Sequence, residues 1–393
     1  MNKSASSSPG DATIRVLHVL FDDRYGGPQK RIIKSAGAFR RLGVELELAI
    51  PDRGGNAEAA AKRENVLVHR LNIRKFPKPS DPIQLLRWLI TLPWEIRSFA
   101  SFFRNTDPDI VNISGAIFFA PAIAARLIGK PLVWHLNDMI FSKTVSRLLG
   151  LIVRSISTQV VAQGEAVARH YYLPAKSYEL VYSHVDTAHF LPATQAELEQ
   201  KAGANQTPVV GIIAHWNPLK GLEYFVDAAI RIRQSEGSNV RFVLIGSKLD
   251  TQKQYGDLIE SMILKGDFSD QLSLMGFVED PAEILRSLDI LVMSSVSEAC
   301  PNVVLEGMSA GISVVATDVG CVRELLKPLN GKPTGIIVPA ADAEELANAV
   351  LVLLRNRRLR DDYGRAAREA AASRFTVENY VQIHEQIYKN AMR

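Results

Sequence analysis

The sequence predicts an α/β protein made of two doubly wound, Rossmann-like domains that face each other across a cleft. The chain of 393 residues is too long for one compact core. Short apolar, strand-like runs alternate with helical patterns from end to end, as in parallel sheets covered by helices on both faces. A polar stretch rich in Ala, Gln and Glu, residues 191–207, divides these runs into two series. Sheets of this kind bind ligands at the carboxyl ends of their strands, so the cleft is the expected site.

Each series contains six predicted strands, all of them short apolar runs bounded by turn residues. In the first series they are Ile14–Leu20, Val44–Ile50, Val66–His69, Ile110–Ile113, Leu132–His135 and Gln159–Ala162. In the second they are Val209–Ala214, Val240–Ile245, Gln271–Met275, Asp289–Met293, Ser313–Ala316 and Gly335–Val338.

These runs set the expected domain organisation. Residues 1–11 are polar and rich in Ser, and we expect them to be disordered. An N-terminal domain is placed at 12–190, a linker at 191–207 and a C-terminal domain at 208–374. Residues 375–393 carry aromatic and aliphatic side chains at helical spacing, which predicts a final helix.

The sequence also gives expectations about where in the cell the protein is located. No basic segment followed by an apolar core occurs near the start, so we expect no secretory signal. The longest uncharged run, residues 110–125, is shorter than the roughly 20 residues that a spanning helix needs. The two cysteines, Cys300 and Cys321, lack metal-ligand spacing, which favours free thiols in a reducing cytoplasm.

The net charge of +4 is unevenly distributed. Residues 1–190 hold 25 Lys and Arg against 16 Asp and Glu, giving +9, whereas residues 191–393 hold 21 against 26, giving −5. A basic first half favours an anionic partner such as a lipid surface or a phosphate-bearing acceptor. Ordinary variation in composition is the alternative. We expect no nucleic-acid partner.

The segment from Ser297 to Met308 is the most informative about function. It follows a predicted buried strand, and Pro301 suits the first turn of a helix. The free amides at the start of that helix suit a diphosphate, and the helix dipole adds to the attraction. Glu306, farther along the helix, is placed to accept hydrogen bonds from two ribose hydroxyls, and Glu298, at the loop mouth, to meet a sugar. Alternatively, Glu298 caps the helix and Glu306 is a surface residue.

The residues that follow complete a recognisable pattern. Glu298 and Glu306 are separated by seven residues, after which come a helix of small residues, Gly307–Gly311, and the strand sequence Val314-Val315-Ala316-Thr317. This arrangement resembles the signature of retaining glycosyltransferase family 4. The resemblance extends from Ile14 to Tyr388 and is strongest between residues 289 and 317.

The resemblance implies the two-domain fold called GT-B. It further implies transfer of a sugar from a UDP- or GDP-sugar to a glycan or lipid-linked acceptor, with retention of anomeric configuration, as in surface polysaccharide or glycolipid synthesis. The second domain would hold the nucleotide and the first the acceptor, and the last helix would cross back onto the first domain. No metal and no cofactor other than the nucleotide-sugar co-substrate are implied. The donor-binding residues carried over from this segment are Glu298, Cys300, Pro301, Asn302, Val303 and Glu306.

Two loops at strand ends extend the resemblance. Gly26 and Gly27, before Pro28, match the glycine loop of the first domain that faces the donor phosphates. Lys220 follows the first strand of the second domain and is placed to neutralise the departing diphosphate. The family usually carries Arg five residues before this Lys, but this chain has His215. A histidine offers neither a permanent charge nor the two-pronged donor of Arg, which weakens the expected stabilisation.

Other matches concern the sugar and the base. Family members commonly have His directly before an Asp at the end of the fifth strand; here Asn137 precedes Asp138, and His135 lies two residues earlier. His135 is a candidate catalytic residue, Asn137 and Asp138 are candidate sugar contacts, and a buried core histidine is the alternative for His135. Phe277 and Val278 resemble the segment that reads the base with its backbone.

The string Asp107-Pro108-Asp109 matches a metal-binding motif of the other glycosyltransferase fold, but its context differs, so we interpret it as a turn and expect no metal.

Two helical segments combine basic with apolar residues, a pattern that favours anionic lipid interfaces and a peripheral position on the inner membrane face. Ordinary packing on a sheet is the simpler alternative. The first, residues 84–104, contains Trp88, Trp94, Phe99, Phe102 and Phe103 among Arg87, Arg97 and Arg104. The second places Lys143, Arg147 and Arg154 beside Val145, Leu148, Leu149 and Ile152.

Other functions share parts of this pattern. A nucleotide-sugar epimerase and a catalytically weak nucleotide-sugar-binding homologue are alternatives on the same fold, the second favoured by His215. A two-lobed sugar-binding protein without catalysis has no reason for the motif from Glu298 to Glu306.

Overall fold

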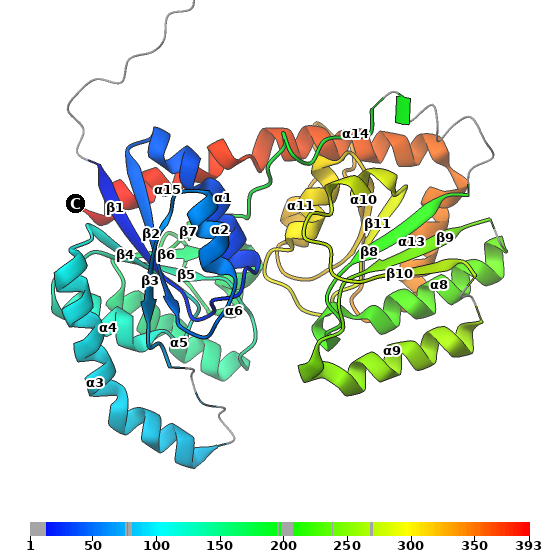
Figure 1. Ribbon diagram of the computed structural model, residues 1–393. Helices are drawn as coiled ribbons and strands as arrows, with labels where there is room; N and C mark the ends of the chain where they lie inside the picture. The colour runs from blue at the N-terminus through cyan, green and yellow to red at the C-terminus, as the bar shows by residue number, and fades with distance from the viewer. Residues whose placement is uncertain are drawn as a thin grey trace, which may run out of the picture. The chain divides into compact units, whose positions relative to one another are not determined.

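The computed structural model describes residues 13–74, 77, 81–194, 196–197, 207–237, 239–267 and 270–393. The expected disordered start at 1–11 and most of the expected linker at 191–207 lie outside these ranges. The chain clusters into two compact units, each with its own parallel sheet (Figure 1). Unit 1 comprises the described residues of 1–163, 168–181 and 378–393, and unit 2 those of 164–167 and 182–377. The domain boundaries given above stay predictions.

Unit 1 is built on a seven-stranded parallel sheet in the order β3-β2-β1-β4-β5-β6-β7. All six strands predicted for the first half are present, whereas the seventh was missed because two residues give no periodic signal. The strands are β1 (Ile14–Val19), β2 (Val44–Pro51), β3 (Leu67–Leu71), β4 (Ile110–Ser114), β5 (Leu132–Leu136), β6 (Gln159–Ala162) and β7 (Glu179–Leu180).

Helices follow nearly every strand of this sheet, as right-handed crossovers between parallel strands require. They begin where the sequence provides the usual signals: Pro lies in the first turn of α1 (Gly27–Arg41), and the Asp81 side chain accepts a hydrogen bond from the amide of Gln84 at the start of α3 (Pro82–Thr106). The helices are α1 (Gly27–Arg41), α2 (Ala57–Arg63), α3 (Pro82–Thr106), α4 (Phe119–Leu127), α5 (Lys143–Ile156), α6 (Glu165–His170) and α15 (Val377–Ala391).

Helices cover both faces of this sheet. Trp134 and His135 are consecutive on β5, so their side chains point to opposite faces. The ring of Trp134 lies against Phe119 of α4, with centroids 6.4 Å apart, and His135 stacks on His384 of α15 at 5.3 Å. Helices α4 and α15 therefore lie on opposite faces.

Unit 2 is built on a six-stranded parallel sheet in the order β10-β9-β8-β11-β12-β13. All six strands predicted for the second half are present, most within one residue of the expected ends. They are β8 (Val209–Ile213), β9 (Arg241–Ile245), β10 (Leu272–Met275), β11 (Ile290–Met293), β12 (Ser313–Thr317) and β13 (Ile336–Val338).

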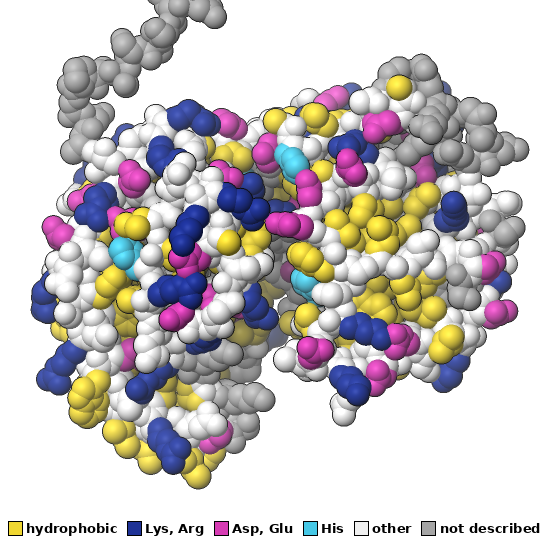
Figure 2. Space-filling view, viewed as in Figure 1, with side chains coloured by type: hydrophobic (Ala, Val, Ile, Leu, Met, Phe, Trp, Pro, Cys, Tyr) yellow, Lys and Arg dark blue, Asp and Glu magenta, His cyan; other side chains and the backbone are white. Residues whose placement is uncertain are grey.

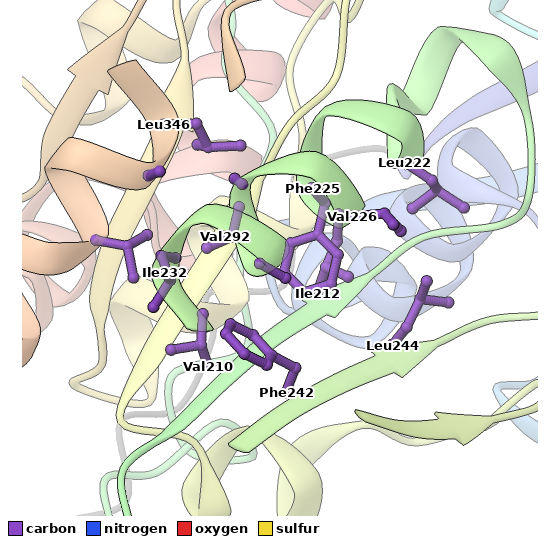
Figure 3. Packing of buried hydrophobic residues seen from close by; sticks show 14 of the residues in the cluster. Val210, Ile212, Leu222, Phe225, Val226, Ile232, Phe242, Leu244, Val292 and Leu346 are labelled. Carbon is purple, nitrogen blue, oxygen red and sulfur yellow. The ribbon is translucent and has the colours of Figure 1, made fainter. Parts of the chain in front are cut away.

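The core of unit 2 lies between this sheet and its helices. Val210, Phe242 and Leu244 point from neighbouring strands toward α8 (Leu222–Glu236), and these three residues and Phe225 of α8 are buried (Figure 3). The rings of Phe225 and Phe242 meet edge to face, with centroids 6.4 Å apart. The helical elements are η1 (Pro218–Lys220), α8 (Leu222–Glu236), η2 (Asp250–Gln252), α9 (Lys253–Gly266), α10 (Ala282–Ser287), α11 (Asn302–Ser309), α12 (Val322–Leu325), α13 (Ala343–Arg355) and α14 (Arg357–Arg374).

Candidate functional site

The strand order of unit 2 reverses between β8 and β11, and an open parallel sheet binds ligands in the crevice outside the carboxyl ends of strands at such a point. These two strands are hydrogen-bonded neighbours, but the chain continues from β8 toward β9 on one side and from β11 toward β12 on the other. The loops that follow them must therefore diverge, which makes this point the usual ligand site of an open parallel sheet. Lys220 ends the first loop and Glu298 lies in the second.

Lys220 and Glu298, identified separately in the sequence, form an ion pair here. The Lys220 ammonium donates a hydrogen bond to Oε1 of Glu298. The Ser295 hydroxyl donates to the same oxygen at 3.1 Å. Ser295 was not recognised as part of the site, because a serine at a strand end is too common to be a signal. The pair places one cation and one carboxylate side by side at the crevice.

Backbone contacts hold the two loops together beneath this pair. The amide of Val296 donates to the carbonyl of Leu219 at 2.9 Å, and the Ser294 hydroxyl donates to the carbonyl of Lys220 at 3.1 Å. Gly221 has φ +58°, and a Cβ at this position would lie 2.3 Å from the Ser294 carbonyl oxygen. Only glycine permits this approach, so the loops are fixed by packing as well as by hydrogen bonds.

Helix α11 begins at Asn302, directly after Pro301, as the sequence predicted. Pro301 provides no side-chain capping bond to the first-turn amides, so the positive end of the helix dipole faces the loop. Glu306 lies one turn along this helix and is half-buried. Cys300 is buried, and its Sγ accepts a weak hydrogen bond from the amide of Ser183 at 3.4 Å.

A third loop, after β12, braces this segment and was not assigned a role from the sequence. The amide of Cys321 donates to the carbonyl of Ala299 at 2.8 Å. Gly320 has φ +55°, and a Cβ there would lie 2.3 Å from the same carbonyl oxygen. The Thr317 hydroxyl donates to the carbonyl of Ser295 at 2.5 Å. The loop from β11 to α11 is thus held from both sides.

His215 lies on the exposed side of the same loop as Lys220. Its Nδ1 is 3.2 Å from the Ser247 hydroxyl, and its ring is parallel to that of Phe277, with centroids 6.1 Å apart and an angle of 7°. Phe277 follows β10 and is 65% exposed, and Val278 beside it is half-buried. Three loops of unit 2 therefore bring His215, Ser247 and Phe277 together.

The glycine loop of unit 1 lies at the start of α1. Gly26 caps the helix and Gly27 is its first residue. A Cβ at position 26 would meet the Gln29 side chain at 3.4 Å and the Arg24 carbonyl oxygen at 4.0 Å, which are ordinary contacts, so packing in the unit does not require glycine. The close approach of a donor phosphate to Gly26 and Gly27 stays a prediction.

His135 lies in the core of unit 1. It stacks on His384 and is buried. Burial is the main cause that holds the pKa of His135 well below the usual range, and the nearby His384 and Arg31 lower it further. Its Nε2 has no hydrogen-bond partner among the residues that the structure describes. This is the environment of a core histidine, and a catalytic role for His135 stays a prediction.

Asn137 and Asp138 follow β5 and are half-buried. Oδ1 of Asp138 accepts a hydrogen bond from the Tyr171 hydroxyl at 2.6 Å. Burial first, and then the Asp138 carboxylate, raise the pKa of Tyr171, so this tyrosine stays a donor. The hydrogen bond fixes one carboxylate oxygen of Asp138, and sugar contacts by Asn137 and Asp138 stay predictions.

The Asp107-Pro108-Asp109 string is engaged in ordinary contacts. Asp107 pairs with Lys130 at 2.6 Å, and Oδ2 of Asp109 accepts from the amide of Arg15 at 2.8 Å. In the part of the chain that the structure describes, no group of three or more His, Cys, Asp or Glu side chains is arranged to hold a metal ion. Metal-independent activity stays a prediction.

Comparisons with known proteins agree with this architecture. Residues 207–356 match the family described as glycosyl transferases group 1, and residues 25–189 match glycosyltransferase family 4. The chain is 25% identical over 381 residues to a GDP-mannose-dependent alpha-mannosyltransferase of Mycobacterium tuberculosis (strain CDC 1551 / Oshkosh), covering 92% of both chains. It is 26% identical over 350 residues to alpha-D-kanosaminyltransferase of Streptomyces kanamyceticus, covering 80% of this chain and 86% of the relative.

A solved structure shares the fold. The crystal structure of Anabaena Alr3699/HepE in complex with UDP-glucose superimposes with a TM-score of 0.77 at 20% identity, covering 96% of this chain and 100% of the other. The sheets, the site in unit 2 and the two family matches, which together span most of the chain, lead to one conclusion. The chain belongs to glycosyltransferase family 4: it is a glycosyltransferase of the GT-B fold, in a family of enzymes that use nucleotide-sugar donors.

Proposed function

We propose that this enzyme transfers a hexose from a GDP- or UDP-sugar to a glycan or lipid-linked acceptor, with retention of anomeric configuration. The observation that carries the proposal is the meeting of Lys220 and Glu298 at the crevice of unit 2, beside the uncapped start of α11. A cation and free helix amides suit a diphosphate, and a carboxylate suits sugar hydroxyls.

Each group has a distinct task in this proposal. The bond between the anomeric carbon and the diphosphate oxygen breaks as an acceptor oxygen bonds to the same carbon, and the hydroxyl proton leaves with the diphosphate. Lys220 and the first amides of α11 neutralise the charge that develops on the leaving group. Glu306 binds the ribose hydroxyls, and Glu298 orients the donor sugar. The protein supplies position and charge and excludes water.

The donor class is supported by the relatives. One is named as GDP-mannose-dependent, and the Anabaena protein was crystallised with UDP-glucose. The acceptor class is supported by the basic first half of the chain, which suits phosphate-bearing or lipid-linked molecules. We place the reaction in surface polysaccharide or glycolipid synthesis, in the cytoplasm at the inner face of the membrane, without a metal.

A nucleotide panel tests the donor. GDP and UDP, with ADP as the comparison, are titrated by calorimetry, and the tightest binder defines the base. The matching nucleotide-sugar is then incubated with candidate acceptors, and the anomeric configuration of the product is determined by NMR. Binding of no nucleoside diphosphate contradicts the proposed site. An inverted product contradicts the stereochemistry alone.

His215 favours a second candidate, a homologue that binds nucleotide-sugars but transfers slowly. It stands where the family usually has Arg, and it is exposed beside Ser247. Tight donor binding with negligible transfer by the parent enzyme supports this candidate. Conversion of the donor into an isomer without any acceptor indicates a nucleotide-sugar epimerase instead.

A further inference from the structure

Helix α3 exposes an apolar stripe to solvent. Ile83, Leu86, Ile90 and Trp94 recur at intervals of three or four residues and therefore share one side of the helix. All four are exposed, Ile83 by 66% and Trp94 by 63%. A helix that only packs on a sheet turns such a stripe inward. Figure 1 shows this half of α3 extending away from the sheet.

The neighbouring helices continue this surface. Helix α3 contacts α4, which in turn contacts α5. Val145, Leu148 and Leu151 are exposed on α5, and Leu127 is exposed at the end of α4. Figure 2 shows hydrophobic side chains gathered where Figure 1 draws α3, with Lys and Arg among them.

The charge on this surface is almost entirely positive. Helices α3, α4 and α5 together contain seven basic residues and one acidic residue, Glu95. Burial raises the pKa of Glu95. The basic residues are all exposed: Arg87, Arg97, Arg104, Arg126, Lys143, Arg147 and Arg154.

The other aromatic residues of α3 do not contribute. Phe99 and Phe103 are buried, Phe102 lies edge to face with His69 at 5.2 Å, and Trp88 does so with Phe119 at 6.4 Å. The sequence suggested that all five aromatic residues of this segment lie at a lipid interface. This expectation is wrong for Trp88, Phe99, Phe102 and Phe103, which pack within unit 1. Trp94 is the aromatic residue of α3 that faces solvent.

We propose that the outer surface of α3, α4 and α5 docks on an anionic phospholipid bilayer. The apolar stripe of α3 inserts between headgroups, with Trp94 at the interface, while the row formed by Lys143, Arg147 and Arg154 on α5 contacts lipid phosphates. Among the described residues, no helix is long and apolar enough to cross a membrane, so this attachment is peripheral. A second copy of the chain is a poorer occupant, since a two-fold contact would bring two basic surfaces together.

Vesicle sedimentation with matched variants tests the surface. The parent enzyme should bind vesicles of phosphatidylcholine with phosphatidylglycerol at low salt, bind less at high salt, and ignore phosphatidylcholine alone. Joint substitution of Lys143→Gln, Arg147→Gln and Arg154→Gln should lower partitioning about a hundredfold. The control, Lys253→Gln with Lys265→Gln and Arg358→Gln, removes the same charge from exposed positions of unit 2 and should bind like the parent.

Trp94 provides an independent signal. Of the four tryptophans, Trp134 and Trp216 are buried and Trp88 packs on Phe119, so insertion should shift the emission of Trp94 to the blue. Trp94→Phe should abolish the shift and keep the binding. Trp94→Gln should weaken binding, whereas Leu264→Gln, which alters a residue 77% exposed on α9, should not.

Three outcomes overturn the inference: equal binding to neutral and anionic vesicles, unchanged binding of the triple α5 variant, or a dimer in solution that Trp94→Gln dissociates without any vesicle binding. The inference deepens the proposed membrane location and does not depend on the transfer reaction. Nucleotide affinity without vesicles, which should be equal in parent and variants, separates failure of this surface from failure of the donor site.

Discussion

Lys220 and Glu298 form an ion pair that joins the loops after β8 and β11 in unit 2. The ammonium donates to Oε1 of the carboxylate, which also accepts from Ser295 at 3.1 Å. This pair holds the lysine at the carboxyl edge of the sheet, and in the proposed reaction a diphosphate replaces the carboxylate as its partner. In the same proposal Glu298 then accepts hydrogen bonds from sugar hydroxyls, while Ser295 still donates to Oε1. The contact joins two residues that are 78 positions apart in the chain.

We first predict that Lys220→Ala lowers kcat by about 100- to 1000-fold. The reason is that a preorganised charge on a developing anion typically contributes this much to the rate. Affinity for the nucleoside monophosphate should change far less, because that ligand lacks the terminal phosphate. Lys253→Ala, in an exposed position at the start of α9, is the control. A kcat equal to that of the parent would rule out the leaving-group role.

The second prediction concerns Glu306 and the ribose. Glu306→Gln should weaken nucleoside diphosphate binding, since a hydrogen bond to a charged group contributes about 1.5–3 kcal/mol. Calorimetry with the diphosphate and its 2′-deoxy analogue isolates the contact: the parent should prefer the ribonucleotide, and the variant should not. Glu344→Gln, at an exposed position of α13, should keep the preference. A variant that retains the full preference would disprove the assignment.

Gly320→Ala should reduce nucleotide affinity indirectly, through the loop that carries Glu298, because the proposed donor site does not include Gly320. A Cβ would collide with the Ala299 carbonyl oxygen at 2.3 Å, and the left-handed backbone adds about 1–2 kcal/mol of strain. The loop carrying Glu298 must then move. Gly331→Ala is the control, because Gly331 also has a positive φ, +76°, but no atom within 4 Å of the added Cβ. Equal affinity losses in both variants would show that strain alone is responsible.

His215→Arg should raise kcat if the only deficiency of the site is missing charge. Arginine places a permanent cation near Lys220 and offers two parallel hydrogen bonds to phosphate. The measurement is the initial transfer rate at saturating donor, with His215→Gln as the uncharged control. A lower rate for the arginine variant would indicate that the contact of His215 with Ser247, or its stacking on Phe277, has its own function.

Stability should fall as the pH drops below the ordinary pKa of histidine. Burial, followed by the nearby His384 and Arg31, lowers the pKa of His18 to about 3, and burial lowers that of His135. Below pH 6.5 the unfolded chain binds protons that these folded histidines do not, so unfolding becomes easier by about 1.4 kcal/mol per pH unit for each.

Urea unfolding at several pH values between 7 and 5 tests this dependence. His18→Gln should reduce the slope of unfolding free energy against pH. Identical slopes for the parent and His18→Gln would contradict the prediction.

Local sequence determined the secondary structure and the chemical class of the donor site. Strands of four to eight apolar residues and proline-marked helix starts carry their signals within a few positions. For this reason twelve strands and the start of α11 were predicted, whereas the roles of Glu298 and Glu306 stay predictions. Strand β7 was missed because its two residues provide too little of that signal.

The tertiary structure decided which of these residues act together. The pairing of Lys220 with Glu298, and the bracing by Gly320 and Thr317, depend on which strands are neighbours, and periodicity along the chain does not report strand order. The sequence also did not distinguish Phe103 from Trp94, because both occur among arginines on one helix. In the structure Phe103 is buried in the core and Trp94 is exposed to solvent. Such distinctions depend on the direction of a side chain relative to distant segments, which three-dimensional packing alone fixes.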